Sequence, residues 1–219
     1  MNGELTLTLF VNIELMRLCF RPVIFYFLLL CIVSCSVSKD PRRNYVRDLQ
    51  NGKIKEDTSY VYALPYELNT SHLVVQGYFS HYSHKNRIAV DIGMPKGTKV
   101  CAARDGVVVK VVENYTKGGM SKKNLPHANQ VIIQHADGTR AGYWHLKHNG
   151  VLVNVGDTVK RGQVIGLSGR TGYTAMYHLH FFVWRLMPGR NWDQIPTRFH
   201  TSKGDVYLRP FYHYRKISE

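Results

Sequence analysis

From about residue 60 onward, apolar residues fall in short runs separated by turn dipeptides. Runs rich in Val, Ile and aromatic residues cover positions 98–112, 130–135, 141–145, 151–155, 163–167 and 179–185. The dipeptides between them are Asp105-Gly106, Asp137-Gly138, Gly156-Asp157 and Arg161-Gly162. Short runs divided by such dipeptides predict a mostly antiparallel, all-β domain, and no stretch carries an amphipathic helix of three turns.

The same pattern predicts the limits of this domain. A chain of 219 residues has room for one domain with a full core, together with targeting material. Residues 60–190 are expected to form the domain, and residues 191–219 a C-terminal extension that packs on it. Residues 36–59 are polar and charged without an apolar period, so they are expected to be a tether.

The N-terminus carries a different kind of apolar run. Residues 23–33, VIFYFLLLCIV, follow Arg17 and Arg21 and number 11. That length matches the apolar part of a secretory signal and is short of the ~20 residues that span a bilayer. Residues 1–15 contain two acidic residues and no basic one, whereas a start at Met16 gives a short cationic segment. Met16 is therefore the expected initiator, and residues 1–35 are the expected signal peptide.

The end of this signal, Ile32-Val33-Ser34-Cys35, resembles the lipobox of bacterial lipoproteins. The resemblance implies cleavage before Cys35, acylation of that cysteine and attachment to a membrane. An ordinary secretory signal is the alternative. Ser36 gives no inner-membrane retention signal, so the periplasmic face of the outer membrane is the expected location. The cleaved chain would keep only Cys35 and Cys101, which excludes a disulfide framework within it.

Charge narrows the partners only in part. The chain has 29 Lys and Arg against 15 Asp and Glu, a formal net charge of +14, and most of that excess lies outside the apolar N-terminus. A basic domain favours anionic surroundings, which include nucleic acid, anionic lipid and anionic cell-wall polymer. Charge does not distinguish these three. The export signal argues against a nucleic-acid partner.

Histidines and one aspartate carry the candidate chemistry. His178 and His180 stand two apart just before an apolar segment, and on a strand both imidazoles would point to the same face. Such a pair can supply one metal ligand and one neighbouring base. Asp91 lies among apolar residues, where an unpaired carboxylate would be costly to bury, so it is expected to have a cationic or metal partner. His145, in the segment YWHL, is a further candidate.

In this order, the segments are similar to the lysostaphin-like (LytM-type) family of zinc endopeptidases over residues 64–185. The matching segments are QGYFSH ending at His81, AVDIGMPKGTKVCAARDGVVV from Ala89, YWHLKHNGVLVNVGDTVKRGQVIGLSGRTG from Tyr143, and YHLHFFV from Tyr177. The resemblance implies an antiparallel domain of the duplicated hybrid barrel-sandwich type.

The resemblance also implies a site and a reaction. An upstream histidine, Asp91 and His180 would hold Zn²⁺, and His145 and His178 would be the two catalytic histidines. The implied substrate is the peptide of peptidoglycan, cut at a cross-link. Three protein ligands leave a fourth zinc position open for water. His178 could take the proton of the attacking water, and His145 could stabilise the oxyanion or protonate the leaving amine. The sequence leaves the division of roles between them open.

One position departs from the commonest family pattern. Arg87 stands four residues before Asp91, where a histidine is usual. Some relatives instead carry a Ser-His pair further upstream, after a QGY or QGF segment, and His81 and His84 both stand in such pairs. The adjacent QGY segment favours His81, whereas the shorter loop to Asp91 favours His84. His81 is the predicted ligand.

Two other functions fit parts of the sequence. A non-catalytic protein on the same fold could bind the cell wall and activate other hydrolases, but Asp91 and the three downstream histidines are all present. Residues 155–165 also resemble biotinyl and lipoyl carriers, which present a lysine at a hairpin tip that is missing here. The residues do not indicate which cross-bridge is cut or an oligomeric state.

Overall fold

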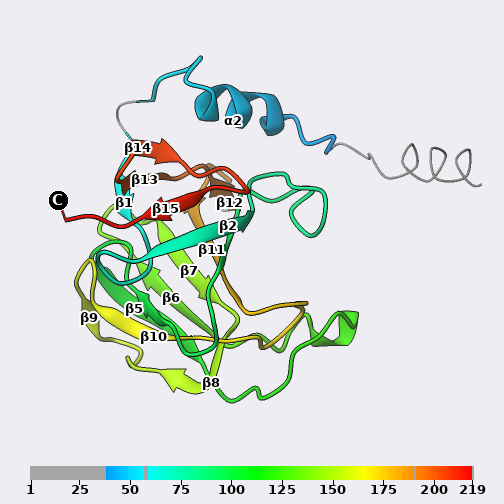
Figure 1. The fold of residues 1–219 in the computed structure, drawn as a ribbon, viewed down its shortest axis with the longest axis vertical. Helices are drawn as coiled ribbons and strands as arrows, with labels where there is room; N and C mark the ends of the chain where they lie inside the picture. The colour runs from blue at the N-terminus through cyan, green and yellow to red at the C-terminus, as the bar shows by residue number, and fades with distance from the viewer. Residues whose placement is uncertain (1–37, 57–58, 190, 219) are drawn as a thin grey trace, which may run out of the picture. The chain divides into compact units, whose positions relative to one another are not determined.

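The computed structural model describes residues 38–56, 59–189 and 191–218, and most of its regular structure is β-strand (Figure 1). The helical elements are α2 (Arg42–Gln50) and the short 3₁₀ helix η1 (Lys122–Asn124). The strands are β1 (Val61–Ala63), β2 (Ser71–Gln76), β3 (Val90–Gly93), β4 (Lys99–Cys101), β5 (Gly106–Val112), β6 (Gln130–Gln134), β7 (Arg140–Trp144), β8 (Leu146–Val151), β9 (Thr158–Val159), β10 (Val164–Ser168), β11 (His178–Leu186), β12 (Trp192–Ile195), β13 (Arg198–Thr201), β14 (Gly204–Tyr207) and β15 (His213–Arg215).

The strands form one large sheet and two small ones. The large sheet has the order β15-β2-β3-β11-β7-β6-β5-β9, and β12 pairs with β11 beside it. The small sheets have the orders β4-β10-β8 and β1-β13-β14. Neighbouring strands are antiparallel except for β1 and β13. The prediction of a mostly antiparallel all-β domain is therefore confirmed.

The two faces of the large sheet have different surroundings. Along β11, Leu179, Phe181 and Val183 are at most 1% exposed and belong to the main hydrophobic core. That core also contains buried residues of the two small sheets, such as Val100 of β4 and Phe199 of β13. Because side chains alternate along a strand, His178, His180, Phe182 and Trp184 point to the opposite face. We call this second surface the open face.

The predicted runs correspond to strands with local differences. The run 98–112 is divided between β4 and β5 at the Asp105-Gly106 turn, as the dipeptide suggests. The run 151–155 is different, because β8 ends at Val151 and residues 152–155 form no strand. Val155 is 62% exposed, so the apolar residues of this run did not indicate a buried strand.

The predicted tether differs from the structure in one part. Residues 42–50 form helix α2, in which Val46 and Leu49 are 1% and 3% exposed. Val46 packs in a small cluster with Phe79 and Ile88. Of the nine residues of α2 only Val46 and Leu49 are buried, too few to show a helical period in the sequence, so this helix depends on its tertiary contacts. The predicted signal peptide and Cys35 lie outside the described residues.

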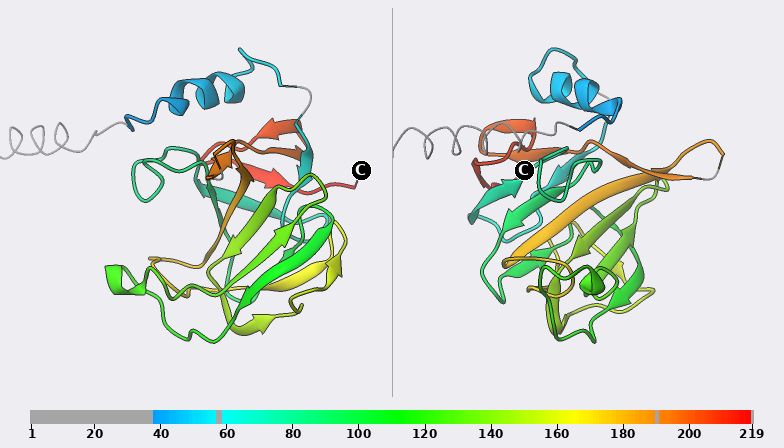
Figure 2. Two further views of the ribbon diagram at one scale, coloured as in Figure 1. Left: turned by 180° about the vertical axis from the view of Figure 1, so that it is seen from behind. Right: turned by 90° about the vertical axis from the view of Figure 1, so that its right-hand side faces the viewer.

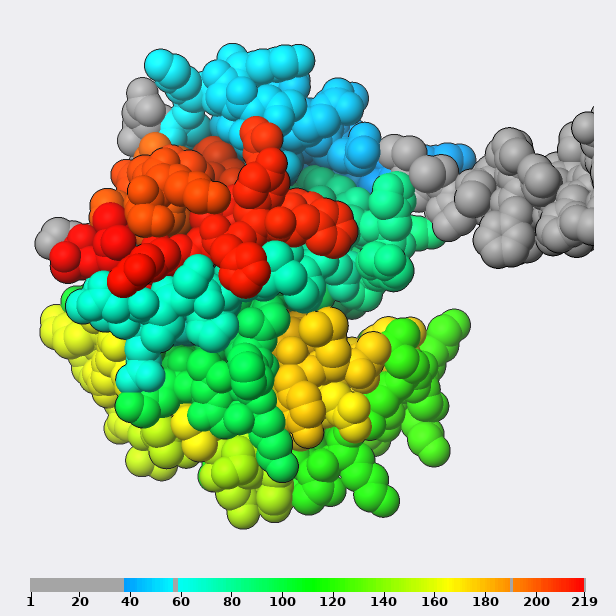
Figure 3. Space-filling model, viewed as in Figure 1, coloured from blue at the N-terminus to red at the C-terminus, as the bar shows by residue number. Residues whose placement is uncertain are grey.

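The segment after residue 190 adds strands that lie together at one end of the domain, drawn in orange and red in the upper part of Figure 2. β12 extends β11 as a hairpin, β13 and β14 join β1, and β15 pairs with β2. In the space-filling view the C-terminal residues, coloured red, lie directly against the residues of β2 (Figure 3). Among the described residues no helix has the length and apolar character needed to span a membrane.

Candidate metal centre and catalytic histidines

Four neighbouring strands bring site residues into one row across the open face. Gln76 of β2 is opposite Asp91 of β3, Asp91 is opposite His180 of β11, and His180 is opposite Trp144 of β7. Residues opposite each other on adjacent strands have neighbouring side chains. Asp91, for which a cationic or metal partner was predicted, therefore has His180 as its neighbour on the adjacent strand.

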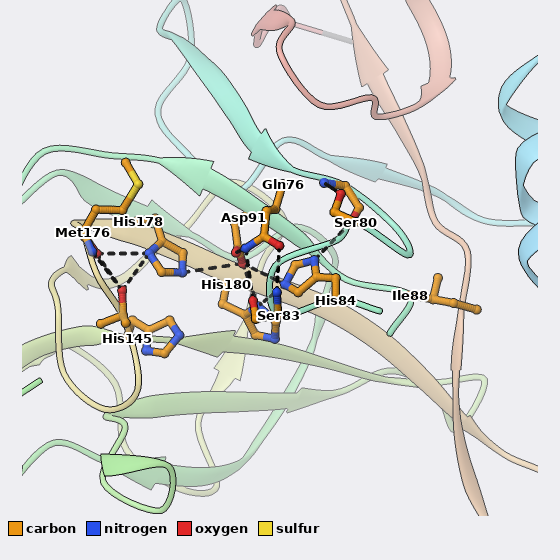
Figure 4. Close-up of polar contacts among 12 residues, drawn as sticks. Gln76, Ser80, Ser83, His84, Ile88, Asp91, His145, Met176, His178 and His180 are labelled. Atoms are coloured by element: carbon orange, nitrogen blue, oxygen red, sulfur yellow. Dashed lines mark hydrogen bonds and ion pairs between the residues drawn. The ribbon is translucent and has the colours of Figure 1, made fainter. Parts of the chain in front are cut away.

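Asp91 and two histidines form a compact group of possible metal ligands (Figure 4). Nδ1 of His180 lies 2.7 Å from Oδ1 of Asp91. Nε2 of His84 lies 3.3 Å from the same carboxylate oxygen and 3.2 Å from Nδ1 of His180. All three residues are buried. Two imidazole nitrogens and one carboxylate oxygen are a donor set that zinc commonly takes.

The loop between β2 and β3 holds His84 in this position. The backbone N–H of Phe79 donates to the carbonyl of Arg87 at 3.0 Å and closes the base of the loop. Nδ1 of His84 lies 3.1 Å from the carbonyl of Gly77. Because a carbonyl oxygen only accepts, Nδ1 carries the proton and, in the neutral ring, Nε2 is left with a lone pair. A hydrogen bond of this kind orients a ligand histidine.

The geometry replaces His81 with His84 as the candidate ligand. His81 is exposed on the loop and does not belong to the group of possible metal ligands, whereas His84 is fully buried beside Asp91. The choice between them depends on how the loop folds back on Gly77. The QGY segment predicted that a ligand histidine would follow, but not which of the two would turn inward.

The charges in the group follow from burial and pairing. Burial alone would raise the pKa of Asp91, but the charge and hydrogen bond of His180, with smaller effects of His84 and His178, hold that pKa well below its ordinary value. Burial lowers the pKa of His180 against the attraction of Asp91. At neutral pH Asp91 is therefore ionised and His180 neutral, and a carboxylate beside a neutral imidazole is a form that binds a cation.

Among the described residues, a polar side chain supports Asp91, whereas Nε2 of His180 has no such support. The side-chain amide of Gln76 donates to Oδ2 of Asp91 at 2.8 Å, which leaves Oδ1 for the histidines. The amide oxygen of Gln76 accepts from the backbone N–H of Ser83 at 3.2 Å. Gln76 thus links the carboxylate to the loop that carries His84. Nε2 of His180 has no hydrogen-bond partner in the part of the chain that the structure describes. Oδ1 of ionised Asp91 only accepts, so Nδ1 of His180 holds a proton in this structure, and that proton must leave when a cation binds there.

The other two predicted histidines lie beside this group. The rings of His145 and His178 are 4.7 Å apart between centroids, and His145 is 5.8 Å from His180. Nε2 of His178 lies 3.5 Å from Oδ1 of Asp91. The structure therefore brings together Asp91 and the three downstream histidines expected at the metal and catalytic site, and leaves His81 outside it.

Backbone carbonyls set the tautomers of His145 and His178. Nδ1 of His145 donates to the carbonyl of Thr171 at 2.6 Å, and Nδ1 of His178 lies 3.1 Å from the carbonyl of Met176. In both neutral rings Nε2 therefore holds a lone pair. Burial, with the nearby charges of His178 and His180, lowers the pKa of His145 to about 3, so this ring is neutral at neutral pH.

An unusual backbone conformation directs His145 toward the site. Its φ is 68°, in the left-handed region that few residues other than glycine adopt. It follows Trp144, the last residue of β7, and a regular strand would point residue 145 away from the open face. The turn in the backbone brings the imidazole to His178 instead. Strained conformations of this kind are concentrated at functional sites.

Sequence reasoning did not assign a role to Gln76, although it lies in the quoted QGY segment. Its position next to the loop that holds the candidate ligands is the feature from which a role could have been inferred. The carbonyls of Gly77, Thr171 and Met176 could not be found from the sequence, because a backbone oxygen carries no residue-specific pattern.

Comparison with known protein families gives a match over this part of the chain. A family model described as "Peptidase family M23" matches residues 85–194, which is half of the chain and includes Asp91, His145, His178 and His180. His84 lies one residue before the matched part, so its assignment rests on the geometry.

Three curated relatives are peptidases by name. The chain is 42% identical over 92 residues to "Peptidoglycan DD-endopeptidase ShyA" of Vibrio cholerae, covering 42% of this chain and 18% of the relative. It is 39% identical over 121 residues to "Glycyl-glycine endopeptidase ALE-1" of Staphylococcus capitis, covering 54% and 30%. It is 43% identical over 94 residues to "Lysostaphin" of Staphylococcus simulans, covering 42% and 17%. The chain thus spans less than a third of each relative's length.

The chain also matches a solved structure over part of its length. The catalytic domain of the antimicrobial peptidase lysostaphin from Staphylococcus simulans is 34% identical to this chain in the superposed part. The superposition covers 52% of this chain and 79% of that domain, with a TM-score of 0.40.

Proposed function

This chain belongs to peptidase family M23, and from that membership we propose that it is a zinc-dependent endopeptidase that hydrolyses peptide bonds in peptidoglycan cross-links. One observation carries the proposal beyond the family. The candidate ligand atoms of His84, Asp91 and His180 lie 2.7–3.3 Å apart, beside two further histidines whose Nε2 atoms are unprotonated in the neutral rings. The named activities of the relatives supply the substrate class.

The residues fit zinc on chemical grounds. Oδ1 of ionised Asp91 and Nε2 of neutral His84 are both acceptors 3.3 Å apart, so a proton or a metal ion is needed between them. His84, Asp91 and His180 would hold zinc and leave a coordination position for water or substrate. Bound zinc would lower the pKa of a water molecule toward neutrality and polarise the scissile carbonyl.

The two remaining histidines then act on protons. Nε2 of His178 accepts the proton of the attacking water, and the resulting imidazolium gives it to the leaving amine. Asp91, whose Oδ1 is 3.5 Å from this nitrogen, stabilises the positive charge. His145 cannot donate from Nε2 in its resting tautomer, since its proton is on Nδ1. It therefore orients the attacking water as an acceptor, and stabilises an oxyanion only after it has gained a proton itself.

Incubation of the purified protein with purified peptidoglycan tests this function. Mass analysis should find fragments with new peptide termini, released by the zinc-loaded protein and not after chelation, and restored by added zinc. A protein that releases no fragments itself but increases release by a second hydrolase would be the non-catalytic activator instead. The complete set of histidines and Asp91 in the cluster favours catalysis.

For location we propose the lipid anchor predicted at Cys35, with the domain at the periplasmic face of the outer membrane. The support is the apolar run that ends in Ile32-Val33-Ser34-Cys35. Metabolic labelling with a fatty acid should mark the wild-type protein and not Cys35→Ser. Equal labelling of both proteins would contradict the anchor.

A further inference from the structure

The open face carries a cluster of aromatic side chains that the catalytic site does not use. Trp144, Phe182, Trp184 and Trp192 form a continuous series, which we call the aromatic ladder. Trp144 and Phe182 stack with centroids 4.7 Å apart, Phe182 and Trp184 stack at 4.8 Å, and Trp184 meets Trp192 edge-on at 6.2 Å. The ring of His180 is 5.3 Å from that of Phe182, so the ladder begins at the candidate metal centre.

The core does not explain these aromatic residues. The core face of β11 is filled by Leu179, Phe181 and Val183. Phe182 and Trp184 point the other way and are partly exposed, and Trp192 is 41% exposed. The ladder contains all three tryptophans of the chain. Contiguous exposed apolar surface of this kind marks a binding site more often than a structural need.

The backbone beneath the ladder is adapted to it. A Cβ at Gly142 would lie 1.8 Å from the indole of Trp144, so that ring lies directly over the glycine. At the far end, the guanidinium of Arg140 lies 4.5 Å from the ring centre of Trp192, and its Nε donates to Gln134 at 3.0 Å. Polar amide and guanidinium groups therefore border the aromatic rings.

The geometry limits the kind of ligand that can bind here. β11 is hydrogen-bonded to β3 and β12 on one side and to β7 on the other. β7 is likewise paired on both sides, with β11 and β6. The two strands that carry Trp144, Phe182 and Trp184 therefore offer no free edge on which a peptide could add as a further strand, and the short β12 is the edge strand beside them. A ligand must be bound by ring contacts and side-chain hydrogen bonds. A pyranose offers a C–H surface for the rings, and its hydroxyl and acetamido groups offer partners for amides and a guanidinium.

We propose that the aromatic ladder binds the glycan strand, a chain of N-acetylated amino sugars, to which the peptide cut at the metal centre is attached. This inference rests on the proposed function for the identity of the polymer. It adds that the enzyme recognises the sugar part through Trp184 and Trp192. Substrates that retain their sugars would therefore bind more tightly than free peptides.

Tryptophan fluorescence tests the proposal, because every tryptophan of the chain belongs to the ladder. The probe is chitotetraose, four β-1,4-linked N-acetylglucosamine units, titrated into the whole protein with chelator present. A saturable change in fluorescence is expected from the wild type. Trp184→Leu and Trp192→Leu should each weaken the affinity by about tenfold, the loss of one aromatic contact. Phe211→Leu, which removes a 76% exposed ring outside the ladder, is the matched control.

The outcomes separate this inference from the proposed function. Affinities that stay equal in wild type and both tryptophan variants would overturn the ladder as a glycan site. So would a response to a sugar-free cross-linked peptide with none to chitotetraose, which would make it a peptide subsite. The binding assay needs neither zinc nor hydrolysis. Failure of peptidoglycan cleavage with intact, ladder-dependent chitotetraose binding would instead reject the peptidase proposal and leave a glycan-binding domain.

Discussion

At the scale of a residue, His81 and His84 belong to the same loop, but substitution of each is expected to change zinc binding differently. His84→Ala should lose most bound zinc, because it removes one of three ligands from a site whose affinity depends on ligand number. His81→Ala should retain zinc close to one ion per chain. Elemental analysis of folded, zinc-loaded variants measures both. Zinc loss in His81→Ala alone would show that the loop folds differently when the metal is bound.

The histidines two apart on β11 should separate binding from catalysis. His180→Ala should be poor in zinc and inactive, since Nδ1 of His180 is a candidate ligand atom. His178→Ala should keep its zinc and cleave peptidoglycan ~10²–10⁴-fold more slowly, as expected when a general base is removed. Zinc content and cleavage rate are measured on the same preparations, with circular dichroism to check folding. Reversed zinc contents would exchange the two roles, and full activity in both would reject the peptidase.

Much of this site was predictable from residue types, and what was not depends on backbone geometry. The HxH spacing indicated one shared face for His178 and His180, and the apolar surroundings of Asp91 indicated a partner. The resemblance supplied His145, but no local pattern indicated that a left-handed backbone at position 145 would turn it toward the site. The choice between His81 and His84 depends on hydrogen bonds to Gly77 and Gln76, which form only once the loop has closed.

At the scale of an element, helix α2 supports the loop that carries His84. Val46 is 1% exposed and packs with Phe79 and Ile88, which lie on either side of that loop. Val46→Ala removes two buried methyl groups and should lower the free energy of unfolding by about 1.6 kcal/mol. It should also weaken zinc binding by about tenfold, although Val46 touches no ligand, because the support of the ligand is looser.

Denaturant unfolding and a zinc competition titration measure these two effects. Tyr45→Ala is the matched control, since Tyr45 is in the same helix but 44% exposed. An unchanged zinc affinity in Val46→Ala would show that the loop is held by its own hydrogen bonds alone. The pattern of apolar runs predicted most of the strands of the sheet. Helix α2 was not predicted, because its two buried apolar residues have partners only after the loop has folded.

At the scale of the whole molecule, buried neutral histidines make the metal-free protein sensitive to acid. Burial lowers the pKa of His135 and of His180, and that of His145 falls to about 3. Their ordinary pKa is about 6.5 in the unfolded chain, so below that pH the unfolded state binds more protons. Stability is therefore complete above about pH 6.5 and falls as the pH decreases toward 3.

Urea unfolding between pH 7.5 and pH 5.5, with chelator present, measures this loss. His145, with a folded-state pKa of about 3, should contribute about 1.4 kcal/mol of destabilisation at pH 5.5, and His135 and His180 add to the loss in the same direction. Carboxylates do not interfere, because the depressed pKa of Asp91 matters only below about pH 4. His145→Gln should show a smaller dependence on pH than the wild type. Equal slopes in the two proteins would mean that His145 does not stay neutral in the folded state.

The left-handed backbone at His145 has a consequence for anyone who engineers this protein for heat resistance. Methods that rank substitutions by stability would favour glycine at position 145, since glycine adopts a φ of 68° without strain. Relief of that strain is worth about 1–3 kcal/mol, and the substitution also removes a partly buried imidazole. A glycine chosen at this position to relieve the backbone would therefore yield an inactive protein, without the hydrogen bond of His145 to Thr171. At this single position, catalytic activity and thermal stability favour different residues. A screen that selects for melting temperature alone would therefore select inactive variants.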